Sequence, residues 1–522
     1  MSLRKVIIAA AVLCPVALFS QNPEHALVLE SNPQFNASAA ALSDFGKVSI
    51  SQTELSFRKD DGGFIGIDGS ADSWLASAGA ESYSRISDRI VFYGRLSYSY
   101  FKGSGMAGSV LRDMYYNPVT FLEVTPGTEG VKTREQYELD GAISYSLSDR
   151  WSLGLRMDYE SGNNVKTKDP RYRSEWMFMD YDLSVWFRPG DRFAVGASAI
   201  YRNTQELVKS HIFGTTDKTY NLGIDRGAFF GTTEAVEGTY GIVSPSDFQP
   251  MTNNFYGGSL QVRYGAYHGV LKGLYRSGRY GFGTSNMPEY FTYSGPEFSY
   301  EGRFLLGGER SLHDIHFGAG AKFISNTENS FKYTTSAGAN TVVTYTGSKQ
   351  VLDRKDFSAN LGYKGSTGIE SGRPSMQFGF DAEMQMRTLR ATIYPYYRDH
   401  DKTSVEAKAF VDKYFYLSKG MIAFGASVRG GAGFGNAAKD GTLATSTGSN
   451  LKSFDDLLNR QFEFETAPFA GAGLMITYSR PIKKSIEAYC TLSDDFSSLM
   501  KAPEFVAGRS RNVALISLGL TF

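Results

Sequence analysis

The chain has 522 residues, of which 54 are lysine or arginine and 54 are aspartate or glutamate, so its formal net charge at pH 7 is zero. A balanced charge creates no long-range field that would attract a polyanion, and we expect no nucleic-acid partner. Glycine (56), tyrosine (32) and phenylalanine (37) are abundant, whereas proline (16) is scarce. This composition is typical of strands in which apolar and polar residues alternate.

Residues 4–19 start with two basic residues and continue as an apolar run that a cut after Ser20 would release. This arrangement predicts a secretory signal peptide over residues 1–20. A lipoprotein signal ending at Cys14 is the alternative, but it needs a small residue where Leu13 stands. No other stretch reaches the roughly eighteen apolar residues of a transmembrane helix. The exported chain is therefore expected in the periplasm, outside the cell or in the outer membrane as a barrel.

Residues 21–46 follow the signal peptide and precede the first expected strand. The segment is long enough to enter a barrel lumen as a small plug. It could equally remain in the periplasm as an ordinary extension, and the sequence leaves both alternatives open.

From residue 47 onward, apolar side chains recur at every second position in short runs. The clearest case is the hairpin 137–159, in which alternation stops for a three-residue turn at 148–150 and then resumes. On a strand, this period places apolar side chains toward lipid and polar side chains toward a lumen. In a soluble sandwich the charged face would be buried without partners, at a high cost in free energy.

We expect about eighteen such strands, and the number should be even because both ends of an outer-membrane barrel lie in the periplasm. Their ranges are 47–58, 64–83, 89–101, 137–147, 151–159, 181–187, 193–201, 258–264, 269–275, 298–306, 315–323, 357–363, 376–386, 405–411, 421–428, 472–478, 486–492 and 514–522. Fourteen or sixteen strands remain open, because each segment's pattern is weak. The sequence thus predicts an all-β fold, a single transmembrane antiparallel β-barrel over residues 47–522.

Four long segments alternate with the short turns and should lie on the extracellular side. They span residues 102–132, 207–254, 326–354 and 430–463 and are rich in glycine, serine, threonine and asparagine. Recognition of a partner, or closure of a pore, is expected in these loops.

The charged residues on the polar face of the expected strands predict the lining of the lumen. They are Glu138, Asp140, Arg156, Asp158, Glu160, Asp180, Asp182, Arg202, Arg263, Lys272, Arg276, Glu297, Glu301, Arg303, Asp381, Glu383, Arg387, Glu406 and Lys408. They could line a hydrated path of mixed charge, or they could cross-link the wall through ion pairs and leave little room for conduction.

No catalytic residue, metal site or cofactor is expected. Residues 399–401 (Asp-His-Asp) and 494–495 (Asp-Asp) could in principle activate a water molecule at the rim, but the surrounding sequence does not resemble the omptin proteases. His313 and His316 would lie on opposite faces of a strand, so they cannot share a metal. The glycine-rich run 430–435 resembles a phosphate loop only in composition, and a glycine-rich rim explains it.

The whole mature chain resembles a family of roughly 500-residue outer-membrane barrels of the Bacteroidota, known only as a domain of unknown function. The similarity rests on residues 31–33 (Ser-Asn-Pro), 46–48 (Gly-Lys-Val), 59–63 (Lys-Asp-Asp-Gly-Gly) and 517–522 (Ser-Leu-Gly-Leu-Thr-Phe). The resemblance implies residence in the outer membrane, in the neighbourhood of nutrient-uptake machinery, and it implies no catalytic residue.

We therefore expect a channel or transport component for small polar solutes, or part of a nutrient-uptake system. The alternative is a non-conducting structural or adhesive barrel that binds a partner through its long loops, and a rim hydrolase comes third. The expected partners are outer-membrane lipid, the barrel-assembly machinery and uptake-system proteins.

The carboxy-terminal strand yields the first testable prediction. Its outward face ends at Phe522, and an aromatic terminal residue is the usual insertion signal of such barrels. Deletion of Phe522 should lower the amount of heat-modifiable protein in the outer membrane and increase its degradation. Unchanged levels would contradict this role.

Overall fold

The computed structural model has one antiparallel sheet that closes on itself. The structure describes residues 23–215, 217–236, 242, 250–284, 286–334, 342–441, 451–483 and 485–522. The expected signal peptide over residues 1–20 lies outside these ranges.

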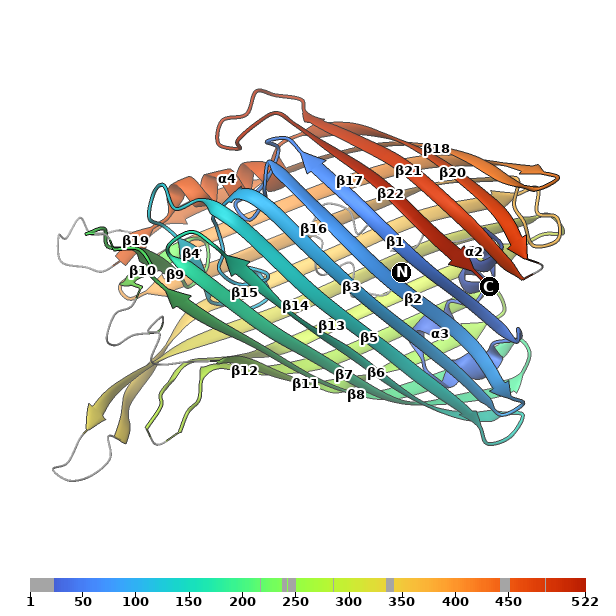
Figure 1. The fold of residues 1–522 in the computed structure, drawn as a ribbon. Coiled ribbons are helices and arrows are strands. Elements are labelled where there is room, and N and C mark those ends of the chain that lie inside the picture. Colours follow the sequence, from blue (N-terminus) through green and yellow to red (C-terminus); the bar gives the residue numbers. More distant parts are fainter. Residues whose placement is uncertain are drawn as a thin grey trace.

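The barrel has eighteen strands, and the first strand pairs with the last to complete the ring, as Figure 1 shows. The wall strands are β1 (Ser49–Asp61), β2 (Asp72–Ser87), β3 (Ile90–Met106), β5 (Gly130–Ser146), β6 (Trp151–Lys166), β7 (Arg171–Gly190), β8 (Phe193–His211), β11 (Pro250–Tyr264), β12 (Tyr267–Gly281), β13 (Glu289–Gly307), β14 (Ser311–Thr334), β15 (Val342–Thr367), β16 (Met376–Ile393), β17 (Tyr396–Leu417), β18 (Gly420–Asp440), β20 (Phe469–Lys483), β21 (Ile486–Leu499) and β22 (Ser510–Thr521). Closure leaves no free edge, so the backbone groups of the wall are paired from strand to strand, as lipid requires.

The predicted fold class and the number of eighteen strands are confirmed. One range was wrong, because residues 64–71, expected in the second strand, are not part of β2, which starts at Asp72. Phe64, Ile65 and Ile67 in this range are buried. These apolar side chains are buried in a loop that folds inward, and they do not face lipid.

The outer surface carries a belt of large apolar side chains on alternate wall positions. Leu155, for example, is 51% exposed and Leu183 is 62% exposed. Such exposure would be costly in water but is favourable against hydrocarbon, so the barrel is of the outer-membrane type.

Three extracellular loops fold into the mouth of the barrel and form a second, four-stranded sheet (Figure 1). Its strands are β4 (Thr120–Glu123), β9 (Asn221–Asp225), β10 (Phe230–Ala235) and β19 (Leu451–Ser453), and helix α4 (Asp455–Thr466) follows β19. We call this sheet, α4 and the loops 62–71 and 107–119 the lid. Its buried side chains Val110, Phe121, Leu222 and Ile224 belong to one apolar cluster with wall residues such as Tyr172 and Phe291.

The glycine run 430–435 does not form a rim, contrary to the prediction, because it lies within wall strand β18. A Cβ atom on Gly433 would come within 2.9 Å of the Thr466 Cα atom in α4. The missing side chain thus lets the lid approach the wall closely.

At the opposite end, the N-terminal residues form α2 (Pro23–Glu30), α3 (Gln34–Ala37) and the short 3₁₀ helix η1 (Ala40–Asp44) (Figure 1). We call residues 23–45 the N-terminal plug, because they contact the inner face of the wall. Within the described ranges, no helix is both long and apolar enough to cross a bilayer.

Neighbouring positions on β6 test the register. Leu155→Arg places a charge toward hydrocarbon at a cost of about 2–4 kcal/mol, and we expect it to impair assembly. Arg156→Leu should be milder, because this side chain faces inward and hydrogen-bonds to the plug. Heat-modifiability on gels measures both effects, and the reverse order would mean a register shifted by one residue.

Candidate functional site

The charged residues predicted to face the lumen all lie on wall strands, and the cross-strand register aligns them on the inner face. Several pair with charged side chains on adjacent strands. Arg202 contacts Asp180 at 2.7 Å, and Arg387 contacts Asp356 at 2.7 Å. The wall is therefore cross-linked in part by ion pairs, as the second of the two predicted interpretations of this set expects.

The N-terminal plug is bound to the wall through its main chain. Arg156 donates to the carbonyl oxygens of Phe35 (2.9 Å) and Asn36 (2.8 Å). Ser144 Oγ donates to the Ala40 carbonyl at 2.9 Å, and the Ala40 N–H donates to Ser184 Oγ at 3.0 Å. These contacts fasten the plug to β5, β6 and β7.

A buried carboxylate at the end of the plug adds an ionic contact. Asp44 lies between Arg188 (2.5 Å) and Arg263 (2.8 Å), and its side chain is almost fully buried. Two guanidinium groups around one carboxylate make a strong, charge-assisted contact. Sequence reasoning identified Arg263 as a lumen residue but missed both Arg188 and Asp44.

Glycine makes room for the plug in the wall. A Cβ atom on Gly154 would lie 2.1 Å from the Ala40 nitrogen, so any side chain here would collide with the plug backbone. Nearby, Phe35 and Phe45 pack against Tyr83, with ring centroids 6.5 and 5.8 Å apart. The plug therefore lies closely against this side of the barrel, and Glu30 of α2 reaches across to Lys364 of β15 at 2.6 Å.

The opposite side of the wall remains accessible near the periplasmic end. Asp381 on β16 faces inward, yet its side chain is 55% exposed, and its partner His316 on β14 is 30% exposed. On the plug side at this end, Ser144 and Trp186 are buried. Water thus reaches the inner wall along β14 to β17.

Higher on the same strands, toward the extracellular end, the inner wall is covered. The inward side chains Arg398, His400 and Lys402 of β17 are all buried, whereas Glu406 and Lys408 below them are partly exposed. Lys402 contacts Glu465 of α4 at 2.7 Å, and Arg398 contacts Asp455 of α4 at 2.9 Å. The lid is therefore in direct contact with β17.

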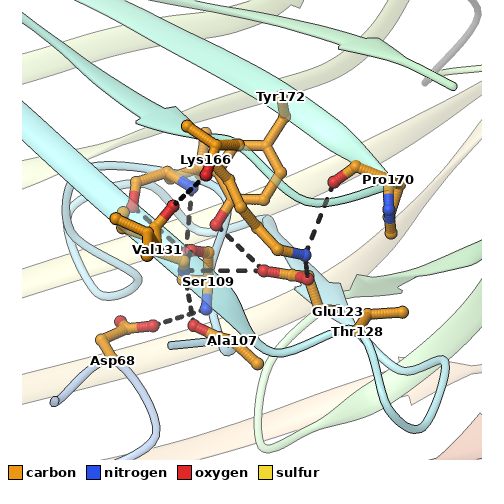
Figure 2. Close-up of polar contacts among 12 residues, drawn as sticks. Asp68, Ala107, Ser109, Glu123, Thr128, Val131, Lys166, Pro170 and Tyr172 are labelled. Atoms are coloured by element: carbon orange, nitrogen blue, oxygen red, sulfur yellow. Dashed lines mark hydrogen bonds and ion pairs between the residues drawn. The ribbon is translucent and has the colours of Figure 1, made fainter. Parts of the chain in front are cut away.

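One carboxylate of the lid is held by three groups of the wall, as Figure 2 shows for Lys166 and Tyr172. Glu123 on β4 pairs with Lys166 of β6, lies 3.6 Å from the Lys132 amine of β5 and accepts a 3.0 Å hydrogen bond from the Tyr172 hydroxyl of β7. All four side chains are buried. Low polarity strengthens these contacts and makes their loss costly.

A second anchor is Arg276 of β12, whose guanidinium is buried without a carboxylate at contact distance in the described part of the chain. It donates to the Tyr116 carbonyl (2.8 Å) and to the side-chain oxygens of Asn117 (2.9 Å) and Asn253 (2.8 Å). Arg354 of β15 donates to the neighbouring Tyr115 carbonyl at 2.9 Å. Two wall arginines therefore hold the backbone of one lid loop.

Asp399 and His400 lie on opposite faces of β17. Asp399 faces outward and pairs with Arg390 at 2.7 Å, whereas His400 faces inward and contacts the Ala437 carbonyl at 2.9 Å. His400 lines a cavity of about 30 Å³ between lid and wall, which has room for only one or two water molecules.

His313 and His316 lie on opposite faces of β14. His313 contacts Tyr363, and His316 contacts Asp381. Among the described residues, no group of three or more His, Cys, Asp or Glu side chains could hold a metal ion. Of the other acidic pair, Asp494 faces outward and accepts a hydrogen bond from Asn512.

The Glu123 cluster was missed from the sequence. Lys132 and Lys166 lie at the ends of β5 and β6, beyond the apolar alternation that marked these strands. Each lysine lies an even number of residues from an inward-facing residue of its own strand, Glu138 on β5 and Arg156 on β6. Extending the alternation along these strands would therefore have placed both lysines inside. Nothing in the sequence links them to Glu123, because that contact depends on how the loop folds back.

The lid should depend on Glu123. Glu123→Gln leaves two buried lysines without their carboxylate, and removal of one partner of a buried pair costs about 3–5 kcal/mol. We expect faster proteolysis within residues 107–129 while the barrel itself stays heat-modifiable. Asp399→Asn, which breaks an exposed pair, is the matched control and should change little. Equal protease sensitivity of the two variants would contradict the anchor.

The lid should also respond to pH through Asp225 on β9. Burial raises the pKa of this carboxyl to about 6, although the Gly227 and Phe230 N–H groups donate to it. A raised pKa means that the folded lid holds the proton more tightly than the unfolded loop, so its stability falls as pH rises from about 4 to about 6 and then levels off.

Hydrogen exchange of the β9–β10 amides, compared at each pH with Asp225→Asn, measures this effect. The ratio of wild-type to variant exchange should rise between pH 4 and pH 6, because asparagine cannot ionise. A constant ratio would contradict the linkage.

Several solved structures have a similar course of strands. The ferric preacinetobactin receptor BauA of Acinetobacter baumannii shares 7% identity and a TM-score of 0.38, over 91% of this chain and 80% of that one. The ferric enterobactin receptor PfeA of Pseudomonas aeruginosa, in a mutant form, has 10% sequence identity and a TM-score of 0.38, over 90% of this chain and 80% of that one. A Pseudomonas aeruginosa FadL homologue has 13% sequence identity and a TM-score of 0.32, over 98% of this chain and 96% of that one. These values are too low to carry an argument about function.

No curated protein sequence matches the chain. The model of a family of unknown function, DUF6850, matches residues 39–522, a range that includes the whole barrel wall and the lid. The match names no organism, so the implied origin in the Bacteroidota stays a prediction. The chain belongs to this family of unknown function, DUF6850.

Proposed function

We propose that the protein is a transport component of the Gram-negative outer membrane, a channel for small polar solutes whose outer end is closed by the lid. The observation that carries this proposal is the contrast along β16 and β17. Inward charged groups such as Asp381 are accessible near the periplasm, whereas Arg398 and Lys402 are buried beneath the lid. A wet polar wall that ends at a separately folded cover is the arrangement expected of a closed channel.

Opening would require the lid to move, because the wall cannot. Separating two wall strands would expose backbone N–H and C=O groups to hydrocarbon, where each unpaired group costs several kcal/mol. The lid is built from loops. It contacts the wall through polar groups around Glu123, Arg276 and Lys402 and through the apolar cluster that it shares with wall residues such as Tyr172 and Phe291. The polar contacts can exchange with water or with a ligand, whereas the apolar contacts must separate for the lid to move.

The alternative is a non-conducting barrel that binds a partner through its outer surface. The β14–β15 hairpin favours it, since residues 344–350 are exposed on both faces where the ribbon extends past its neighbours. The apolar cluster that joins the lid to the wall also suits a permanent platform. Both candidates share the same surroundings of outer-membrane lipid, assembly by the barrel machinery and, for the channel, uptake-system partners.

Planar-bilayer conductance separates the two candidates. The intact barrel should conduct little, and a variant in which a short glycine-serine turn replaces residues 213–249 should conduct steadily, because this removes β9 and β10 from the lid. A barrel that stays closed in both forms would contradict the channel and favour the structural alternative.

The open variant should be weakly selective between small ions. Acids and bases alternate along the inner wall, as in Glu301 with Arg303 and Glu406 with Lys408, and their fields cancel beyond a screening length of about 8 Å at physiological salt. Reversal potentials under a salt gradient measure this selectivity. A value near the ideal limit for cations or anions would contradict a mixed lumen.

A further inference from the structure

The wall beneath the N-terminal plug recognises peptide main chain. Arg156, Ser144 and Ser184 contact the carbonyl or N–H groups of Phe35, Asn36 and Ala40, at 2.8–3.0 Å. None of these hydrogen bonds involves a side chain of the plug. A different sequence in the same conformation would make them equally well.

The wall also offers an anion site at a fixed distance along this peptide. Asp44 is bound by both Arg188 and Arg263, four residues after the Ala40 contact. One carboxylate leaves the two guanidinium groups with an excess positive charge. The site therefore selects a ligand with a carboxylate at this position.

Shape adds further selectivity on both sides of Ala40. Residues 39–41 are alanines that are almost completely buried, and the Gly154 backbone lies directly against them. Phe35 and Phe45 fill an aromatic cluster with Tyr83 and Tyr93. The wall thus fits a short peptide with small residues in the middle, an aromatic residue at each end and an acid near its carboxyl end.

The plug does not use all the polar groups that the wall presents to it. Trp186 Nε1, Gln261 Oε1 and Arg263 Nε are buried and have no hydrogen-bond partner among the described residues. Buried polar groups are normally satisfied, so these three atoms are open to water or to a ligand group that the plug lacks.

No disulfide holds the plug to the wall in the described part of the chain. The only cysteine in the described ranges is Cys490, on β21, and it is free. The plug joins the barrel through residues 46–48, where Val48 is 80% exposed. Its attachment depends on the contacts above and on this exposed linker.

We propose that this wall is a receptor site for a short peptide bearing a carboxylate, and that residues 33–45 occupy it as an internal ligand. The proposal rests on the proposed transport function, for which it names the class of ligand, and it assigns Arg156, Arg188 and Arg263 to ligand binding. The carboxylate could be an acidic side chain or the ligand's own carboxyl terminus, because two guanidinium groups bind either.

The test is an exchange experiment on the full chain with a protease site introduced at residues 46–48. Cutting this exposed linker leaves every wall strand intact. A fluorescent, amidated peptide of residues 33–45 is then added, and its binding is followed by anisotropy. We expect saturable exchange, and about ten- to hundredfold weaker binding for the Asp44→Asn peptide, the range for a hydrogen bond to a charged group. A peptide of residues 33–43 with one added asparagine and a free carboxyl terminus tests the second source of the carboxylate.

Arg263→Gln in the barrel is the complementary variant, and it should weaken binding of the wild-type peptide by a similar factor. If the Arg263→Gln barrel fails to assemble, the comparison of the wild-type and Asp44→Asn peptides still tests the proposal, because that substitution leaves the barrel unchanged. A cut plug that cannot be exchanged, or equal binding of the wild-type and Asp44→Asn peptides, would overturn the proposal. If the lid-shortened barrel conducts ions but the cut barrel binds no peptide, only the peptide site is refuted. If the peptide binds but the lid-shortened barrel does not conduct, only the channel is refuted.

Discussion

Backbone pairing in a medium without water is the constraint on which the rest of this structure depends. It closes β1 onto β22 and leaves the wall no freedom to open. With most of the outer face committed to lipid, the inward polar side chains of the strands must be satisfied inside. Water, cross-strand ion pairs and segments of the chain itself provide the partners, and the lid and the N-terminal plug are such segments.

The two closures differ in kind. The lid has its own sheet, shares an apolar cluster with the wall, and covers the inner wall at the extracellular end through buried charges such as Glu123 and Arg276. The plug is short and contacts β5 to β7 mainly through its main chain, and it reaches β15 through the Glu30–Lys364 ion pair. A polar surface around Asp381 therefore remains in contact with water beside it. The lumen is consequently asymmetric, both along its axis and around its circumference.

The wall could be predicted from the sequence because alternation with period two is a local property. It identified eighteen strands. The closures could not be predicted in this way. Ile65 and Ile67 alternate like a strand although they belong to the lid, and Gly154 and Gly433 acquire meaning only when another segment packs on them. Contacts between loops far apart in sequence leave no periodic trace.

The central claim is that the lumen is wet from the periplasmic side and sealed on the outer side. Asp381→Cys, in a chain where Cys490 is replaced by serine, tests it most directly with a small water-soluble maleimide applied to barrels inserted in one orientation. We expect rapid labelling from the side of the periplasmic turns and none from the side of the lid. Equal labelling from both sides, or none from either, would contradict it.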